Sequence, residues 1–391
     1  MKLSRNLLAI ATLAALAAPT AHAEVPIDVI AGSEVSFEGL LQADINWFDS
    51  DVANLNGDAQ DGSDADQELR RAEIVLKGKG PGNLEWVVGY DAKSDKWLDT
   101  NIKYKIGGNG NHFFQLGQFK QPNSLEELSS TKNNDFISKA MITNTFAVSR
   151  RVGVGYGYGD SNWGVTASVF GDELKRGNAA GNGFAARGYF APINDKGNIL
   201  HLGLSYASYD AEQAVVNGNN VDNTARFRTR PNADLSGVRL VDTGNLPFAD
   251  KINTTGVEAM WVRGPVKLQG EYMRSKVSRD NGQPDFSGDG AYVSALWNVT
   301  GETWGYKGGV PSTPLPDEPG IGMWQLGARY DKINLDDAPV LGGEMSAWTL
   351  GVNWYWRSNF KIALNQVMVD SSRRGIDDNP NITEMRFQFY W

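Results

Sequence analysis

The chain of 391 residues contains no cysteine, so disulfide bonds do not hold it together and a cysteine-ligated metal site is excluded. Beyond residue 23 it also lacks a run of about 20 uncharged apolar residues, and this excludes a membrane-spanning helix. Histidine is scarce. Only His112 and His201 follow residue 23, which leaves no zinc or copper cluster and no recognisable catalytic triad. We therefore expect a protein that is not an enzyme and needs no cofactor.

Residues 1–23 have the three parts of a secretory signal. Lys2 and Arg5 make a positive start, residues 7–18 form an apolar run, and a small-x-small cleavage site follows. The apolar run is too short to serve as a permanent membrane anchor. The sequence thus predicts an exported protein with a cleaved signal peptide and one mature domain over residues 24–391.

The mature part is dominated by alternation of apolar and polar residues, which predicts strands whose two faces meet different environments. The alternation is clear in residues 35–47, 84–90, 98–106, 202–206 and 350–356. Some strands are separated by short glycine- and asparagine-rich stretches, and others by long polar connections. Short turns at one end and long loops at the other are typical of a transmembrane β-barrel.

The last seven residues end this alternation on an aromatic side chain. As a strand, they place four apolar residues on one face: Met385, Phe387, Phe389 and Trp391. Arg386, Gln388 and Tyr390 lie on the other face. Outer-membrane barrels end in this way because the last strand closes against the first and its aromatic residue lies in the interfacial girdle. We therefore expect an all-β fold, an antiparallel transmembrane β-barrel in the outer membrane.

The length predicts the number of strands. About 368 mature residues, at roughly 20–25 for a strand and its connection, give 16 strands, with 14 or 18 as alternatives. A soluble sandwich or propeller is the other all-β interpretation, but a propeller needs a repeat of about 40–50 residues that the sequence does not contain. The formal charge is −9, or −11 without Lys2 and Arg5, which argues against a nucleic-acid partner.

The chain resembles the phosphate-selective porins O and P, trimeric 16-stranded channels of Gram-negative outer membranes. The resemblance runs along nearly the whole mature length, as short matching pieces in one order. The pieces are LLQAD at 40–44, LRRA at 69–72, LGQFK at 116–120 with SLE at 124–126, HLGLSY at 201–206, RFRTRP at 226–231, GEYM at 270–273, TGE at 300–302 and TLGVNWY at 349–355.

Residues 116–140 contain the segment that we expect to fold into the lumen. The strand that ends at Lys120 is followed by Pro122, and proline cannot continue a ladder. Residues 125–132 have the character of a short helix. In general porins the third long loop makes the pore constriction, and this is the third long connection of the chain. An ordinary surface loop is the alternative.

Arg226, Arg228 and Arg230 alternate with smaller or apolar residues, so an extended backbone places three guanidiniums on one side. The resemblance implies that this loop lies in the lumen and that its arginines form a ladder for anions. Guanidinium suits phosphate because it is always charged and offers paired donors in one plane. Three solvated arginines on a hairpin loop are the alternative.

The resemblance also implies that Lys132 lies at the narrowest point, where an ammonium in a low-dielectric neck acts strongly on a passing anion. The alternative is a lysine that points to solvent. Lys139 is a further candidate for the constriction. Arg71 becomes a cation of the pore wall if its neighbours Ala72 and Ile74 face lipid.

Three positions depart from the family pattern. Leu40 stands where the phosphate-specific members have an arginine, and Glu85 and Ser36 stand where they have lysines. These changes should weaken a tight phosphate site. Three functions stay open: an anion-biased channel for phosphate or related anions, a porin of broad or non-phosphate specificity, and a plugged or enzymatic barrel.

The expected partners are small anions, outer-membrane lipid, lipopolysaccharide and two further copies in a homotrimer. The acidic stretch between Asp58 and Glu68 lacks the spacing of an EF-hand. We interpret it as a solvated outer loop that meets divalent ions at the lipopolysaccharide surface.

Overall fold

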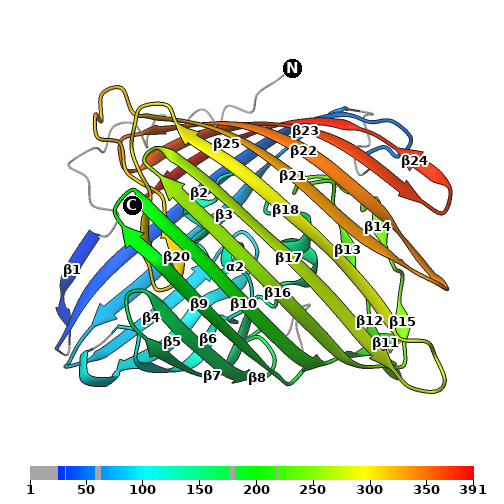
Figure 1. Cartoon of the computed structure of the whole chain (residues 1–391), viewed down its shortest axis with the longest axis horizontal. Helices are drawn as coiled ribbons and strands as arrows, with labels where there is room; N and C mark the ends of the chain where they lie inside the picture. The colour runs from blue at the N-terminus through cyan, green and yellow to red at the C-terminus, as the bar shows by residue number, and fades with distance from the viewer. Residues whose placement is uncertain (1–24, 31, 58–62, 109, 176–180, 217–218) are drawn as a thin grey trace.

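A computed structural model shows a closed barrel of antiparallel strands (Figure 1). The structure describes residues 25–30, 32–57, 63–108, 110–175, 181–216 and 219–391. The predicted signal peptide, residues 1–23, lies outside the described residues, as does part of the acidic stretch. None of the helices in the described ranges is long and apolar enough to cross a membrane.

Within these described ranges the main sheet has 18 strands. β1 and β24 only extend a neighbour, and the other 16 form the ring. The prediction of 16 strands is confirmed. The first half of the ring is β2 (Ser33–Asp49), β3 (Ala65–Lys79), β4 (Leu84–Asp91), β5 (Lys96–Lys105), β6 (Phe113–Lys120), β7 (Arg150–Gly159), β8 (Trp163–Phe170) and β9 (Gly183–Asp195). The second half is β10 (Asn198–Asp210), β16 (Ala249–Arg263), β17 (Val266–Arg279), β18 (Phe286–Asn298), β21 (Met323–Asp337), β22 (Val340–Trp356), β23 (Phe360–Arg373) and β25 (Asn381–Tyr390).

The ring closes where the last strand pairs with the first. β25 runs antiparallel to β2, with Tyr390 opposite Leu40 and Asn381 opposite Asp49. The predicted faces of the last strand are confirmed: Phe387 is 38% exposed on the outside, whereas Arg386 is 3% exposed on the inside.

The outer face of the other strands is apolar and the inner face is polar, as the alternation predicts. On β22, for example, Trp348 and Leu350 are exposed, while Thr349 and Asn353 between and beyond them are buried inside the ring. An exposed apolar belt of this kind is stable in lipid, where each backbone polar group of a closed barrel is paired with a neighbouring strand.

Smaller elements lie at the ends of the ring and inside it. The strands are β1 (Val25–Ile30), β11 (Glu212–Val216), β12 (Asn219–Ala225), β13 (Arg228–Thr229), β14 (Val241–Asp242), β15 (Leu246–Pro247), β19 (Gly305–Lys307), β20 (Val310–Ser312) and β24 (Ile376–Asp378). The helices are α2 (Leu125–Leu128) and α3 (Met141–Phe146), with 3₁₀ turns η1 (Ile106–Gly108) and η2 (Thr131–Asn133). The sequence analysis did not predict β1, whose six residues come before the first long run of alternation at residue 35.

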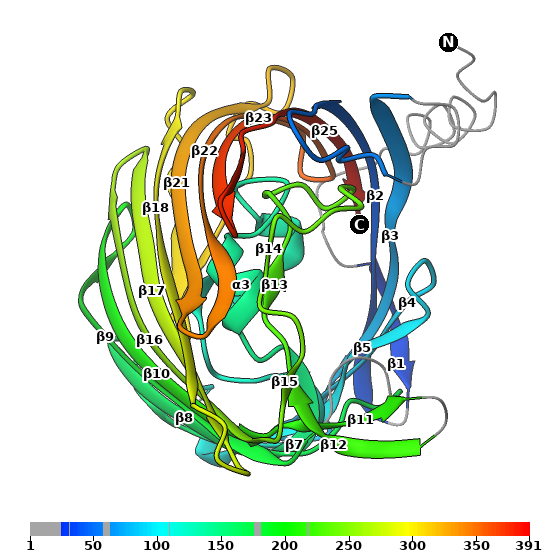
Figure 2. The same cartoon turned by 90° about the vertical axis from the view of Figure 1, so that its right-hand side faces the viewer.

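In the described part of the chain, the connections after β6 and after β10 leave the same end of the barrel and turn into the ring. We call residues 121–149 the L3 segment and residues 211–248 the L5 segment. Figure 2 shows α3 of the L3 segment and β13 and β14 of the L5 segment enclosed by the wall strands. Their apolar side chains share one core inside the barrel: the rings of Phe146 and Phe227 lie 5.4 Å apart, and Phe227 stacks on Phe286 of β18 at 5.9 Å. The two segments are thereby fixed to one side of the wall.

A third inward contact comes from the opposite end, from residues 299–322, which connect β18 to β21. Trp304 of this segment is fully buried against Leu125 of α2 and Met260 of β16. The Tyr306 hydroxyl lies 2.6 Å from Nδ1 of His201, and the Thr313 hydroxyl donates to the carbonyl of Asn133 at 3.3 Å. The 299–322 segment therefore packs under the L3 segment.

Candidate functional site: the channel lining

The L3 segment leaves the wall at Pro122 and forms a short helix at once. The Ser124 hydroxyl accepts a hydrogen bond from the backbone N–H of Glu127 at 3.2 Å and so caps α2. Glu271 on β17 accepts from the N–H groups of Leu125 and Glu126, at 2.9 and 2.8 Å. Four N–H groups at the start of a helix lack partners within it, and here a wall carboxylate binds two of them.

Wall cations hold the rest of the L3 segment through its backbone carbonyls. Lys361 Nζ donates to the carbonyl of Asn134 at 2.7 Å, and Arg386 donates to the carbonyl of Ile137 at 2.8 Å. Gln388 donates to the carbonyl of Lys132 at 3.1 Å. The predicted inward loop is thus bound along its length to β23 and β25, far from the strands that it connects.

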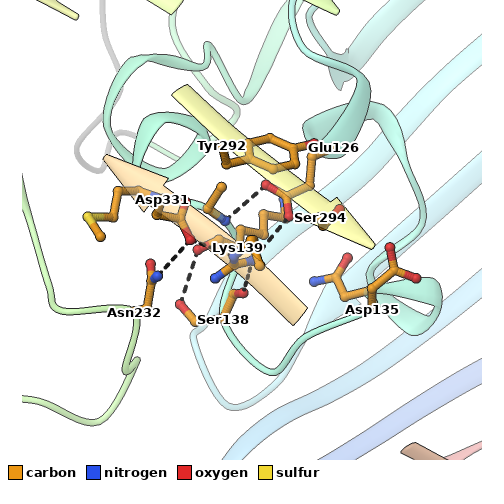
Figure 3. A network of polar contacts seen from close by, with 12 residues as sticks. Glu126, Asp135, Ser138, Lys139, Asn232, Tyr292, Ser294 and Asp331 are labelled. Atoms are coloured by element: carbon orange, nitrogen blue, oxygen red, sulfur yellow. Dashed lines mark hydrogen bonds and ion pairs between the residues drawn. The ribbon is translucent and has the colours of Figure 1, made fainter. Parts of the chain in front are cut away.

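A polar network joins the L3 segment to the L5 segment and to β21 (Figure 3). Asp331 accepts from the N–H of Met141 at 3.2 Å and from the side chain of Asn232 at 2.8 Å. Arg329 donates to the carbonyl of Ser138 at 3.0 Å and lies 3.6 Å from Glu126. Burial raises the pKa of Glu126, which Arg329 opposes. The network therefore joins the L3 segment to the L5 segment and to the wall at β21.

Lys139, a predicted constriction residue, forms an ion pair with Glu127 of α2. Lys120, which ends β6, donates to the carbonyls of Glu127 and Ser129 at 2.5 and 2.9 Å. Burial works against ionisation of Glu127, but Lys139 and Lys120 outweigh it and lower the pKa of the carboxyl to about 2. The positive charge of Lys139 is therefore largely balanced within the L3 segment.

Lys132, the other predicted constriction residue, lies near Glu38 on β2. Its Nζ is 4.0 Å from Oε1 of Glu38, and Lys77 of β3 donates to the same oxygen at 2.6 Å. The Lys132 side chain also approaches the ring of Tyr390, at 5.7 Å from its centroid. Two ammonium groups thus share one carboxylate at this position of the wall.

Arg71 lies on the inner face of β3, and its neighbour Ile74 is 49% exposed on the outer face. Its guanidinium donates to Gln42 at 2.7 Å and lies 3.4 Å from Glu73. The register of β2 and β3 shifts here, because Gln42 pairs with Arg71 and Ala43 pairs with Leu69. Arg70 is the extra residue of this β-bulge, and a bulge re-aims the side chains beside it.

The arginines of the L5 segment lie as an extended backbone requires. Phe227 and Thr229 are buried, whereas Arg226 and Arg228 are exposed and Arg230 is half-buried. Arg226 forms an ion pair with Asp242, its Nε lying 2.8 Å from Oδ1. Arg230 donates to the carbonyl of Ser236 at 2.6 Å. The burial of Phe227 in the core shared with α3 is what turns the guanidiniums to the other side.

Arg239, which the sequence did not suggest, joins these three arginines. Burial lowers its pKa, and so does repulsion from Arg230, Arg228 and Arg226, while Asp242 opposes the shift. Arg239 lies in the connection between β13 and β14, two residues before Val241, which pairs with Thr229. Arg239 lacks the alternating pattern that marks the other three.

The six predicted cations therefore form three separate groups. The L5 arginines lie together, Arg71 lies on the wall beside the bulge, and Lys132 and Lys139 lie on the L3 segment with separate carboxylate partners. The departures from the family pattern lie on the wall: Leu40 is 5% exposed opposite Tyr390, and Glu85 accepts from Lys105 at 2.5 Å.

Several residues that shape this lining were missed from the sequence. Arg386 and Lys361 bind the L3 segment, and the polar face of each strand could have suggested them. Asp234 of the L5 segment accepts from Arg70 at 3.2 Å, and nothing in its sequence context suggests that contact. Within the described ranges, no group of three or more His, Cys, Asp or Glu side chains could hold a metal ion.

Comparison with known proteins places the chain. The model of the family described as phosphate-selective porin O and P matches residues 41–391. Porin O of Pseudomonas aeruginosa is 26% identical over 410 aligned residues, which cover 91% of this chain and 89% of that protein.

Two solved structures share the fold. The trimer form of OmpT from Vibrio cholerae has a TM-score of 0.59 at 13% identity and covers 92% of this chain and 100% of its own. The anion-selective porin from Comamonas acidovorans has a TM-score of 0.55 at 12% identity, with the same coverage. The chain belongs to the phosphate-selective porin O and P family and is an outer-membrane porin.

Proposed function

We propose that the protein is an anion-biased diffusion channel that carries phosphate or related small anions. The observation that carries this proposal is the group of four arginines in the L5 segment. Arg226, Arg228, Arg230 and Arg239 lie together, and in the described part of the chain only Asp242 forms an ion pair with one of them. A surplus of guanidinium charge raises the local concentration of anions, and guanidinium binds phosphate through paired donors.

The comparisons support the same direction. The name of Porin O and the description of the Comamonas acidovorans channel as anion-selective belong to those proteins. From them we expect that this channel also favours anions over cations. Membership of a porin family favours a channel over an enzyme.

A porin of broad or non-phosphate specificity is the second candidate. The paired charges of the wall favour it: Lys77 and Lys132 share Glu38, Arg71 lies beside Glu73, and Lys105 binds Glu85. A cation that already has a carboxylate partner attracts a passing anion less strongly. The two candidates differ in the affinity of the channel for phosphate. Weak binding is compatible with transport, because an ion that is to pass must also leave its site.

Reversal potentials in planar bilayers test the proposal. In a potassium chloride gradient, we expect the reversal potential to have the sign of the chloride equilibrium potential. Addition of phosphate should reduce the chloride current. A reversal potential near the value for potassium would contradict an anion channel. An anion-selective current that phosphate leaves unchanged would favour the second candidate.

We further propose a homotrimer in the outer membrane, exported with cleavage after Ala23. The trimer form of OmpT from Vibrio cholerae supports this assembly for the fold. The acidic outer stretch between Asp58 and Glu68 would meet divalent ions among the lipopolysaccharide phosphates. A mild detergent gel tests the assembly, since a trimer should migrate slowly until it is heated. Mass measurement of the mature protein should give Glu24 as the first residue.

A further inference from the structure

The strongest cluster of charges outside the L5 arginines lies at the bulge of β3. Arg70 and Arg71 are adjacent in sequence, and adjacent residues of a regular strand point to opposite faces. The register shift between Gln42 and Ala43 changes this, so both guanidiniums have partners inside the ring: Arg71 bonds Gln42, and Arg70 bonds Asp234. The bulge therefore brings two guanidiniums to one place on the lumen wall, where Glu73 lies 3.4 Å from Arg71.

Asp234 reaches this place from the L5 segment. Its Oδ2 accepts from Nε and Nη2 of Arg70, both at 3.2 Å, and lies 3.9 Å from Nη2 of Arg386. Its Oδ1 accepts from the hydroxyl of Ser138 at 3.2 Å. Donors from β3 and from the L3 segment thus bind one carboxylate, as guanidinium and hydroxyl groups bind an oxyanion. Arg386 of β25 adds only its nearby charge, because it donates to Asp44 at 2.7 and 2.6 Å.

The position borders the open lumen. The side chain of Asp234 is 17% exposed and that of Arg70 is 28% exposed, whereas Arg386 behind them is 3% exposed. Ala233 and Leu235 on either side of Asp234 are buried in the core of the L5 segment. The backbone of Asp234 is therefore fixed, and its carboxylate is held in the arginine cluster at a high effective concentration.

We propose that Asp234 is a built-in competitor that occupies an oxyanion site formed by Arg70 and Ser138, with Arg386 close behind. This inference deepens the proposed function and rests on it. A diffusing phosphate or carboxylate must displace the tethered carboxylate or bind beside it, so this level of the channel binds anions weakly and releases them quickly. Electrostatics agree, because burial raises the pKa of Asp234 but Arg70, Arg386 and Arg71 outweigh it and lower it to about 2.

Asp234 also connects the L5 segment to the wall, so a purely structural clamp is the alternative. Two substitutions separate these roles, because each removes the ion pair. Asp234→Asn leaves the arginines without the competing charge, whereas Arg70→Ala removes the main donor of the site. A clamp predicts that both variants change the channel in the same way. A competitor predicts opposite changes.

The experiment measures chloride current through purified trimers in planar bilayers while inorganic phosphate is added. We expect Asp234→Asn to lower the phosphate concentration for half-block by about tenfold or more, Arg70→Ala to raise it or leave no block, and the double variant to lose the gain. Asp285→Asn, which removes one exposed carboxylate of another loop, is the control for net charge and should match the wild type. Heat-modifiable migration reports folding; Asp234→Ser replaces Asp234→Asn, and Arg70→Gln replaces Arg70→Ala, if the first variant fails it.

Equal half-block concentrations for wild type and Asp234→Asn would overturn the inference, and so would parallel changes in Asp234→Asn and Arg70→Ala. The reversal potential of the wild type is recorded in the same membranes. A cation-selective wild type would contradict the proposed function, whereas the difference between wild type and Asp234→Asn tests the competitor separately.

Discussion

Glu38 on β2 accepts a hydrogen bond from Lys77 on β3, with 2.6 Å between Oε1 and Nζ. The same oxygen lies 4.0 Å from Nζ of Lys132. The carboxylate of Glu38 therefore tunes the cation that the family resemblance places at the narrowest point of the channel. Its removal would take away the carboxylate that Lys132 and Lys77 share at this position.

Replacing Glu38 by glutamine should increase the ratio of anion to cation permeability. A unit charge about 10 Å from an ion, in a medium with an effective dielectric constant of about 40, contributes about 0.8 kcal/mol, or about a fourfold change in the ratio. Reversal potentials in a chloride gradient measure it. Glu344→Gln, which removes an exposed carboxylate beside Lys332, is the control, and equal ratios in the two variants would contradict a role for Glu38.

Replacing Arg226, Arg228 and Arg230 together by alanine should lower the same ratio, because the L5 segment loses three guanidiniums and keeps Asp242. Lys132→Glu should lower it more, since that change places a second carboxylate beside Glu38 in the neck. The assignment of these residues as the anion path fails if both variants keep the wild-type reversal potential.

Phosphate should block the chloride current of the wild type only weakly. Leu40 and Glu85 replace cations that the phosphate-specific members carry, and Glu85 is paired with Lys105. Leu40→Arg should strengthen the block, because position 40 faces inward between Tyr390 and Glu73. Leu40→Gln tests size and polarity without charge. Tight, saturable block of the wild type would show that these two positions do not set the affinity.

Trp304→Ala should loosen the 299–322 segment beneath the L3 segment. The ring is fully buried, and truncation of a buried aromatic residue costs about 3–5 kcal/mol. We expect noisier single-channel current and a higher conductance. Trp297→Ala removes a ring that is 49% exposed on the outer face of β18, and this variant should leave the conductance unchanged. Similar conductance in all three proteins would show that the segment does not restrict the channel.

The difference between wild type and Asp234→Asn should depend on pH in one direction. The arginines that face Asp234 lower its pKa from an ordinary value of 3.8 to about 2. A lowered pKa means that the docked carboxylate stabilises the L5 segment fully above the unfolded value, and that this contribution is lost as the pH falls through the folded value. The difference in permeability ratio should therefore persist from pH 7 to about pH 4 and shrink toward about pH 2. Reversal potentials at these three pH values check it, and a difference that disappears above about pH 5 would contradict the assignment.

The wall of the channel could be predicted from the sequence because its determinants are local. Alternation fixes which residues face lipid, and it correctly placed Phe387 outside and Arg386 inside. Pro122 correctly marked the departure of the L3 segment from the wall. The family resemblance led to the prediction that Arg226, Arg228 and Arg230 lie in the lumen. The burial of Phe227 between them is the physical reason that their side chains point to the same side.

The contacts that tune the lining could not be predicted because they join distant segments. Asp234 meets Arg70 across 164 positions of the chain, and the bulge that re-aims Arg70 depends on the register with β2. Neither leaves a pattern of charge or hydrophobicity in the sequence. The 299–322 segment was overlooked for a different reason: its glycines and prolines resemble an ordinary turn region, and only the burial of Trp304 distinguishes it.

The pairing of β2 with β25 also constrains the order in which the chain can fold. The Gln42 side chain bonds Gln388 across 346 positions, so the seam forms between the earliest and the latest wall strands to be synthesised. Until β25 arrives, β2 and β23 each keep an open edge that can pair with another chain. Closure with such a long separation in sequence is also slow, because the loop entropy is lost before the contacts form. The vulnerable species in assembly is therefore a nearly complete, open sheet, and the final ten or so residues decide whether it closes on itself or on a neighbour.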